Sequence, residues 1–195
     1  MPRAMPRPSH ALAVVALAAC QTATTPAPAT ITLRGDGDGV TLTRTTDGCR
    51  ADDVAIAVGA DGAVTAGRWR LAPGPAGLEL RDGDRLVARI VDEPGPPPRR
   101  SYLDELGVPL ARVTFTADAA AVTGPDRTAA GRLTRADGQL RWTDAAERAT
   151  AAVLGTDDVE VGAALAIPPA LPILGRAVVA CARLAATSPQ PAKSP

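Results

Sequence analysis

The chain has 195 residues, of which 46% are hydrophobic and 2% aromatic, and its 21 basic side chains balance 21 acidic ones. This length fits one domain with a substantial core, and the balanced charge offers no basic excess for phosphates, so we expect no nucleic-acid partner. Because His10 is the only histidine, the rest of the chain lacks the commonest general base and metal ligand. This excludes Ser-His-Asp and Cys-His catalysis and histidine-containing zinc sites from it.

Residues 1–20 have the pattern of a secretory leader. Arg3 and Arg7 form a basic region, and the uncharged run from Ala11 to Ala19 is too short to span a bilayer. The run closes with Leu17-Ala18-Ala19-Cys20, which resembles the lipobox of bacterial lipoprotein signal peptides. The resemblance implies that residues 1–19 are a signal peptide removed before Cys20, the lipidation site, whose acyl chains would hold the protein on a membrane. The alternative is an ordinary secretory leader with a chance cysteine.

The residues after Cys20 indicate where the domain is held. In some Gram-negative lipoproteins an aspartate in the next position retains the protein at the inner membrane, so Gln21 favours the outer membrane, facing the periplasm or the cell surface. Residues 20–30 are small, polar and proline-rich, and we expect them to form a disordered tether. Residues 187–195 have a similar composition, and we expect a disordered tail.

Between tether and tail the pattern alternates short apolar segments with tight turns. Asp-Gly pairs favour hairpins because a type I′ turn needs positive φ at both central residues. The pairs are Asp36-Gly37, Asp38-Gly39, Asp47-Gly48, Asp61-Gly62, Asp82-Gly83 and Asp137-Gly138. With about a dozen strand candidates, residues 31–186 are predicted to form one mainly β domain, an antiparallel barrel or sandwich-like meander with a buried C-terminal α-helix.

The last third of the domain has a different pattern. Asp144 to Glu147 matches a capping box before an alanine-rich stretch, which favours a short helix, although Ala149 to Leu154 also suits a strand. Val159 to Ile167 suits a buried strand, and Leu171 to Ala186 is predicted to be a helix that is apolar on most faces and therefore buried. Val161 to Leu174 is too short and too broken by prolines to span a membrane.

A shell of antiparallel strands followed by one apolar C-terminal helix resembles the tubby-like barrel, shared with scramblase-like and LURP-related proteins. The resemblance covers about residues 31–186, is architectural, and implies that the last helix threads the barrel. That family's association with phosphoinositides depends on basic surface residues that have no match in this sequence, so the resemblance supplies a shape and no binding residues.

Cys49 and Cys181 remain once Cys20 is lipidated. Two cysteines in an oxidising envelope suggest one disulfide between an early hairpin and the last helix, and the alternative is two separate buried thiols. A calcium loop beginning at Asp36, with Asp38 and Asp47, is disfavoured because Val40 occupies a position that needs an oxygen ligand. We therefore expect turns there and no metal site.

The remaining polar and aromatic candidates also have plain explanations. Adjacent carboxylates on a strand face opposite ways, so Asp52-Asp53, Asp104-Glu105 and Asp157-Asp158 are expected to be solvated turns and not a catalytic dyad. The four aromatic residues are few and scattered, and are expected to fill the core and not to form a stacking platform: Trp69, Tyr102, Phe115 and Trp142.

These patterns favour a lipid-anchored envelope protein that acts as a non-catalytic structural or binding module without a cofactor. Its expected partners are the membrane, through the acylated N-terminus, and another envelope protein. Two alternatives stay open at this point. One is a hydrolase that uses carboxylates alone, which needs two of them converging in a pocket with a raised pKa. The other is a carrier of a lipid or another hydrophobic ligand, which needs a hollow barrel.

Overall fold

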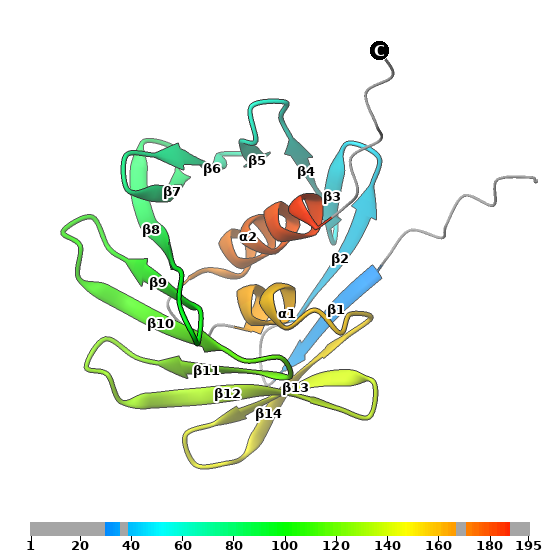
Figure 1. Cartoon of the computed structure of the whole chain (residues 1–195). Helices are drawn as coiled ribbons and strands as arrows, with labels where there is room; N and C mark the ends of the chain where they lie inside the picture. The colour runs from blue at the N-terminus through cyan, green and yellow to red at the C-terminus, as the bar shows by residue number, and fades with distance from the viewer. Residues whose placement is uncertain (1–29, 36–38, 167–170, 188–195) are drawn as a thin grey trace, which may run out of the picture.

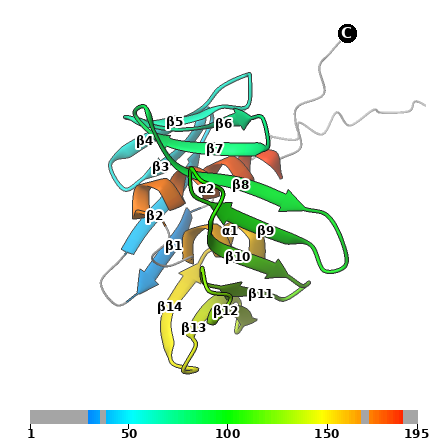
Figure 2. The same cartoon turned by 90° about the vertical axis from the view of Figure 1, so that its left-hand side faces the viewer.

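The computed structural model describes residues 30–35, 39–166 and 171–187. The predicted signal peptide (residues 1–19), Cys20, the tether apart from Thr30 and the tail apart from Thr187 lie outside this part of the chain. In this part of the chain, fourteen strands form a barrel that surrounds a pair of helices (Figures 1 and 2).

The bounds of the elements follow chain order. The strands are β1 (Thr30–Gly35), β2 (Gly39–Thr45), β3 (Gly48–Ala51), β4 (Val54–Val58), β5 (Val64–Ala66), β6 (Trp69–Gly74), β7 (Gly77–Asp82), β8 (Arg85–Glu93), β9 (Arg99–Leu103), β10 (Pro109–Phe115), β11 (Ala119–Thr123), β12 (Ala129–Ala136), β13 (Gln139–Asp144) and β14 (Ala149–Leu154). The helices are α1 (Val159–Ala166) and α2 (Ile173–Ala186).

Every strand pairs with its neighbours in sequence, antiparallel throughout, and β1 closes the sheet against β14. The closing register places Thr32 opposite Leu154 and Gly35 opposite Ala151. The predicted mainly β domain with a buried C-terminal helix is confirmed, and of the two predicted architectures the barrel is the correct one. Closure leaves the described sheet without an unpaired edge strand.

Because the sheet is an up-and-down meander, its turns alternate between two ends of the barrel. The end that holds Thr30 and Thr187 is here called the terminal end, and it carries the turns at residues 46–47, 59–63, 75–76, 94–98, 116–118 and 137–138. The opposite end is called the distal end, and it carries the turns at residues 52–53, 67–68, 83–84, 104–108, 124–128 and 145–148.

The Asp-Gly pairs within the described residues lie at turns, as predicted. The clearest is Asp137-Gly138 between β12 and β13, where φ is +53° and +73°, the pair of positive angles that a type I′ hairpin requires. Asp61-Gly62 lies between β4 and β5, Asp47-Gly48 leads into β3, and Asp82-Gly83 ends β7. The turn predicted around Asp36 and Asp38 lies outside the described residues.

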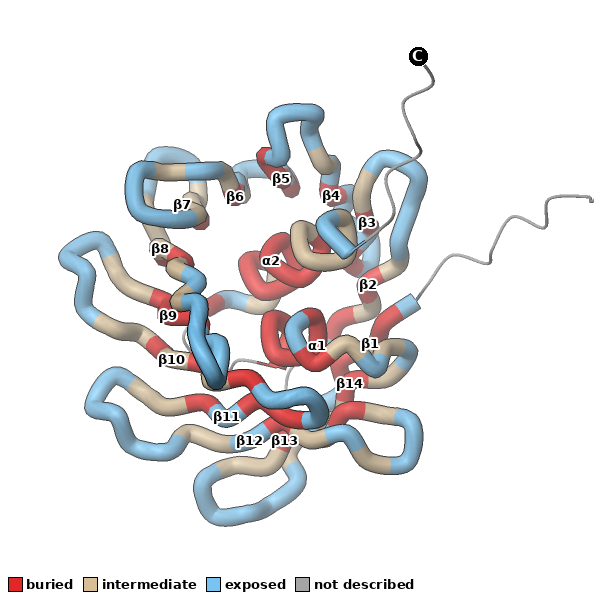
Figure 3. The backbone as a smooth tube through the Cα atoms, viewed as in Figure 1, coloured by how far each residue is buried: buried red, intermediate tan, exposed pale blue. Residues whose placement is uncertain are grey.

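The lumen of the barrel is filled. Inward-facing wall residues such as Leu42, Leu80 and Leu133 are completely buried, and so are most of α1 and the middle of α2, from Gly175 to Cys181 (Figure 3). Helix α1 packs against β10 to β14 and α2 against β2 to β6, so the two helices divide the interior between them. They are also joined to each other, because Nη1 of the buried Arg176 donates a hydrogen bond to the carbonyl of Leu165 at 3.2 Å.

Two expectations for the last third of the domain were wrong. Residues 159–167 were expected to form a strand, but Val159–Ala166 is helix α1. An apolar run of this length fits a buried strand or a buried helix equally well by periodicity. The choice is made at Asp158, whose Oδ1 accepts hydrogen bonds from the backbone N–H of Glu160 at 2.8 Å and of Val161 at 3.2 Å and so caps a helix.

The capping-box pattern at Asp144 does not start a helix. Its Oδ1 accepts hydrogen bonds from the N–H groups of Ala146 and Arg148, both at 2.9 Å, as a helix cap would, but Glu147 adopts a φ of +61°. That angle turns the chain back into β14, which was the alternative for residues 149–154.

Helix α2 confirms the prediction of a buried C-terminal helix, with a start two residues later than expected. It lies in the lumen, as the barrel resemblance implied (Figure 1). Among the described helices, none has the length and hydropathy needed to cross a membrane.

Candidate functional site

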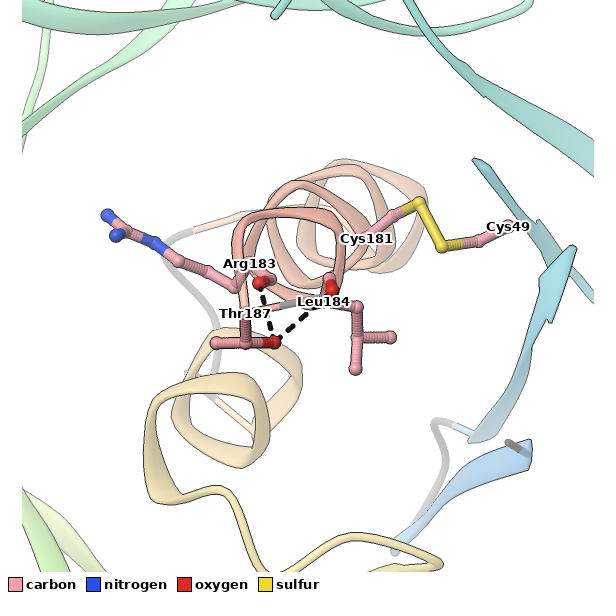
Figure 4. Close-up of a disulfide and its surroundings, with 5 residues drawn as sticks. All are labelled: Cys49, Cys181, Arg183, Leu184 and Thr187. Atoms are coloured by element: carbon pink, nitrogen blue, oxygen red, sulfur yellow. Dashed lines mark hydrogen bonds between the residues drawn. A yellow bond between two sulfur atoms is a disulfide. The ribbon is translucent and has the colours of Figure 1, made fainter. Parts of the chain in front are cut away.

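Helix α2 is fastened to the barrel wall on two opposite sides. Cys49 on β3 and Cys181 on α2 form a disulfide with an S–S distance of 2.06 Å, so the predicted pairing is confirmed. Figure 4 shows Arg183 leaving the helix on the side away from this bond. Its Nη2 donates a hydrogen bond to Oδ2 of Asp92 on β8 at 2.6 Å. The helix is therefore held by a covalent bond on one side and an ion pair on the other.

That ion pair belongs to a network of four charges at the terminal end. Arg100 on β9 donates to Asp92 at 2.6 Å and to Glu160 on α1 at 2.7 Å, and Arg183 lies 3.9 Å from Glu160. The guanidinium of Arg100 is 3% exposed, whereas the two carboxylates are about half exposed. The network therefore joins two strands and both helices around one buried cation, which also lies 5.0 Å from the ring centroid of Phe115.

The electrostatics of the network favour permanent charge. Burial would raise the pKa of Asp92, but the hydrogen bonds and charges of Arg183 and Arg100 outweigh burial and hold that pKa below its ordinary value. Burial raises the pKa of the adjacent Tyr102, with a partial offset from the charge of Arg100. A carboxylate held in its ionised form accepts hydrogen bonds and forms ion pairs, whereas a general acid requires a raised pKa.

A hollow of about 460 Å³ lies beside this network at the terminal end. Its wall contains Phe115 and Val159 as apolar surface and the acidic residues Asp157, Asp158 and Glu160. Several of its polar groups already have structural partners: Asp158 caps α1, Glu160 binds Arg100, and Nη2 of Arg135 donates to the carbonyl of Asp157 at 2.7 Å. The polar groups of this hollow chiefly fix the start of α1.

A second hollow, of about 440 Å³, lies at the distal end. Its lining is mixed, and its apolar residues include Leu106 from the 104–108 turn and Pro172 from the start of α2. Asp82, Arg85, Asp104 and Glu105 supply its charged groups, and Asp82 forms an ion pair with Arg68. The remaining lining residues are Trp69, Leu86, Val87 and Leu110. This hollow combines an apolar wall with charges at the margin, as binding clefts commonly do.

The predicted carboxylate pairs are separated by the fold. Asp52-Asp53 and Asp104-Glu105 occupy distal turns, and Asp157-Asp158 precedes α1 at the terminal end. Asp104 serves its own turn, since its Oδ1 accepts hydrogen bonds from the N–H of Leu106 at 2.9 Å and of Val108 at 2.8 Å. In the described part of the chain, no group of three or more candidate metal-ligating side chains is found.

Three of the four aromatic residues are buried as predicted: Tyr102, Phe115 and Trp142. The fourth, Trp69, is half-buried and lines the distal hollow. The charge network itself was not predicted. Its sequence signal is the spacing in β9 that places Arg100 and Tyr102 on the same face of the strand, because a charged side chain beside a buried aromatic residue requires ion-pair partners.

No protein-family model, no curated protein and no solved structure matches the chain.

Proposed function

We propose that the protein is a lipid-anchored envelope protein whose barrel is a non-catalytic binding module. Cys20 carries the acyl chains. The residue after it, Gln21, favours the outer membrane as the membrane that holds them. The barrel binds another envelope protein. The observation that carries the proposal is the fastening of α2 inside the lumen by the Cys49–Cys181 disulfide and the Arg183–Asp92 ion pair. A rigid body of this kind presents fixed surfaces for recognition.

The contents of the lumen favour this proposal over a carrier of hydrophobic ligands. A carrier requires an open interior, whereas α1 and α2 occupy the space inside the wall with residues such as Val161, Leu165 and Val178, each completely buried. The core of wall and helices is one continuous hydrophobic cluster. A lipid would have to displace a helix that a disulfide holds in place.

The charge network favours the proposal over a carboxylate-dependent hydrolase. Asp92 and Glu160 are brought together by the fold, but Arg100 and Arg183 bind them at the terminal end. The lowered pKa of Asp92 suits an ion pair and is opposite to what a general acid needs. The two carboxylates therefore join the helices to the barrel wall through ion pairs.

The position of Thr30 supports a definite orientation on the membrane. Thr30 opens β1 at the terminal end and follows Cys20 by ten positions in the sequence. An anchor at Cys20 would therefore hold the terminal end toward the membrane and leave the distal end facing outward, so that the distal turns are the part of the barrel presented to other proteins.

The anchor is tested by mass spectrometry of the full chain expressed in a Gram-negative bacterium, with C20S as the matched control. We expect a processed N-terminus at an acylated Cys20, recovered in the outer-membrane fraction, and an unacylated C20S protein in the soluble fraction. An unmodified Cys20, or a C20S protein that remains in the membrane fraction, overturns the proposal.

A further inference from the structure

One turn geometry occurs four times in the barrel. In each case the first residue donates its N–H to the carbonyl of the fifth at 2.7 to 2.9 Å, the fourth donates to the carbonyl of the first at 3.0 or 3.1 Å, and the fourth has positive φ. The turns span residues 59–63, 104–108, 124–128 and 144–148. Side chains at their third and fifth positions can therefore be compared directly.

The 104–108 turn differs from the others in carrying large aliphatic side chains. Its third position is Leu106, where the other turns have Asp61, Asp126 and Ala146. Its fifth position is Val108, where the others have Ala63, Thr128 and Arg148. Since the same backbone forms with small or polar residues, the turn itself does not require Leu106 and Val108.

These two side chains are also the most exposed large hydrophobic residues described. Leu106 is 82% exposed and Val108 is 51% exposed, and the next, Val54, also lies at the distal end. The turn fixes the backbone at both positions, because Asp104 accepts hydrogen bonds from both of their N–H groups. Exposed aliphatic side chains mark a contact surface when they adjoin a cleft.

The cleft is the distal hollow, whose rim Leu106 forms. Trp69, Leu86 and Leu110 supply apolar wall, so a protruding side chain and a recess of about 440 Å³ lie next to each other. Asp104 and Glu105 add two carboxylates that form no ion pair with any basic side chain in the described part of the chain. Arg85 also lines the hollow, so an occupant meets apolar surface beside two carboxylates and one guanidinium, which together carry a net negative charge.

We propose that the distal hollow and the Leu106–Val108 tip form a docking site for a segment of another protein that places one apolar side chain beside basic side chains. This deepens, and rests on, the binding function proposed above. The net negative charge of the lining favours this occupant over a second copy, whose matching surface carries the same net charge. The same carboxylates repel an anionic membrane surface.

The structure supplies a reporter for the test. The chain has two tryptophans, and Trp69 lines the hollow whereas Trp142 is buried inside the barrel. In a W142F background the emission therefore comes from Trp69 alone. The full chain carrying C20S is titrated with a capped five-residue peptide that has a leucine between two pairs of arginines, so that the result does not depend on acylation. Calorimetry on the protein with both tryptophans provides a second measurement.

Two matched peptides test the chemistry of recognition. One replaces the arginines by glutamates and the other replaces the leucine by glycine. We expect a saturable shift in Trp69 emission with the arginine–leucine peptide, and about tenfold weaker binding by each of the others. Equal binding of the glutamate peptide, or no saturable signal at millimolar peptide, overturns the proposal.

The sister turn supplies the matched protein variant. L106A with V108R gives the 104–108 turn the side chains that Ala146 and Arg148 provide in the 144–148 turn, whose hydrogen bonds are the same, so we expect it to fold. We expect it to bind the arginine–leucine peptide about tenfold more weakly. Unchanged affinity contradicts the proposal, as does a dimer at the same protein concentration that this variant abolishes. The failure of lipidation at Cys20, by contrast, would leave the peptide result unaffected.

Discussion

Arg100 shows how unequal the two sides of a buried ion pair can be. Its guanidinium is 3% exposed, whereas Asp92 and Glu160 are about half exposed. Removing the arginine leaves carboxylates that water can reach and that Arg183 still contacts. Removing the carboxylates leaves a buried cation without its two ion-pair partners, and this destabilises the folded state more than removing the arginine does.

We therefore expect R100M to lower the free energy of unfolding by about 1–2 kcal/mol, and D92N combined with E160Q to lower it by about 3 kcal/mol or more. Adding R100M to the double variant should restore part of the loss. Urea unfolding followed by circular dichroism measures all three proteins. If the double variant is no less stable than R100M, Arg100 does not depend on these carboxylates.

The lowered pKa of Asp92 makes a pH prediction. A carboxyl group whose pKa is lower in the folded state than in the unfolded one, where it is about 3.9, contributes stability that is present above that value and is lost as the pH falls through the folded pKa. Stability should therefore decrease from about pH 5 downward, and D92N should make the decrease shallower. The measurement is the urea midpoint from pH 6 to pH 2, and equal slopes for both proteins would contradict it.

At the scale of elements, the disulfide is the decisive contact of α2. It joins residues 132 positions apart, from the early wall to the last helix. In the chain-entropy model a loop of this size stabilises the folded state by about 4–5 kcal/mol. Both cysteines are buried, at 3% and 0% exposure, so the bond belongs to the core of the barrel.

We expect C49A with C181A to lower the free energy of unfolding by about 4 kcal/mol and to reduce hydrogen-exchange protection in α2 more than in the strands. The matched control is the unaltered protein unfolded with and without reductant, which should reproduce the same difference. A double variant with unchanged stability and uniform protection would show that the ion pairs alone hold the helix.

The strands of the barrel wall were easier to predict from the sequence than the two helices inside it. The strands and turns of the wall could be predicted because Asp-Gly pairs and alternation are local signals, as at Asp137-Gly138. Helix α1 could not, since Val159–Ala166 is apolar apart from Glu160 and its state depends on the cap at Asp158. The distal hollow was beyond sequence reasoning, because Trp69, Leu106 and Pro172 meet only through the closure of the barrel.

At the scale of the whole molecule, the two ends of the barrel differ in kind. The terminal end holds Thr30, Thr187 and the charge network, and the distal end holds the exposed aliphatic residues. The longest strand, β8, has nine residues at about 3.3 Å each, and a usual tilt of about 35–45° makes the ends about 20–25 Å apart. This separation is large enough for an optical measurement of orientation.

If the anchor at Cys20 orients the barrel as proposed, a dye attached through A76C at the terminal end should transfer energy to a labelled lipid headgroup more efficiently than one attached through D126C at the distal end. Both positions are exposed turn residues, and the native cysteines are buried in the disulfide. The same dyes on C20S protein should show little transfer. Equal transfer from the two positions on vesicles would contradict the orientation.

The pairing of β1 with β14 also dictates when the molecule can be completed. Thr32 on β1 can pair only once Leu154 on β14 is present, and the helices that fill the interior follow β14 in the chain. A chain that is synthesised from its N-terminus can therefore pair most of its strands before β14 is present to close the barrel. During that time two unpaired strand edges are exposed to solvent. Folding can be completed only after α2 has been synthesised. A polypeptide that ends before residue 173 would have the strands of the barrel but would lack α2, one of the two helices that fill its lumen.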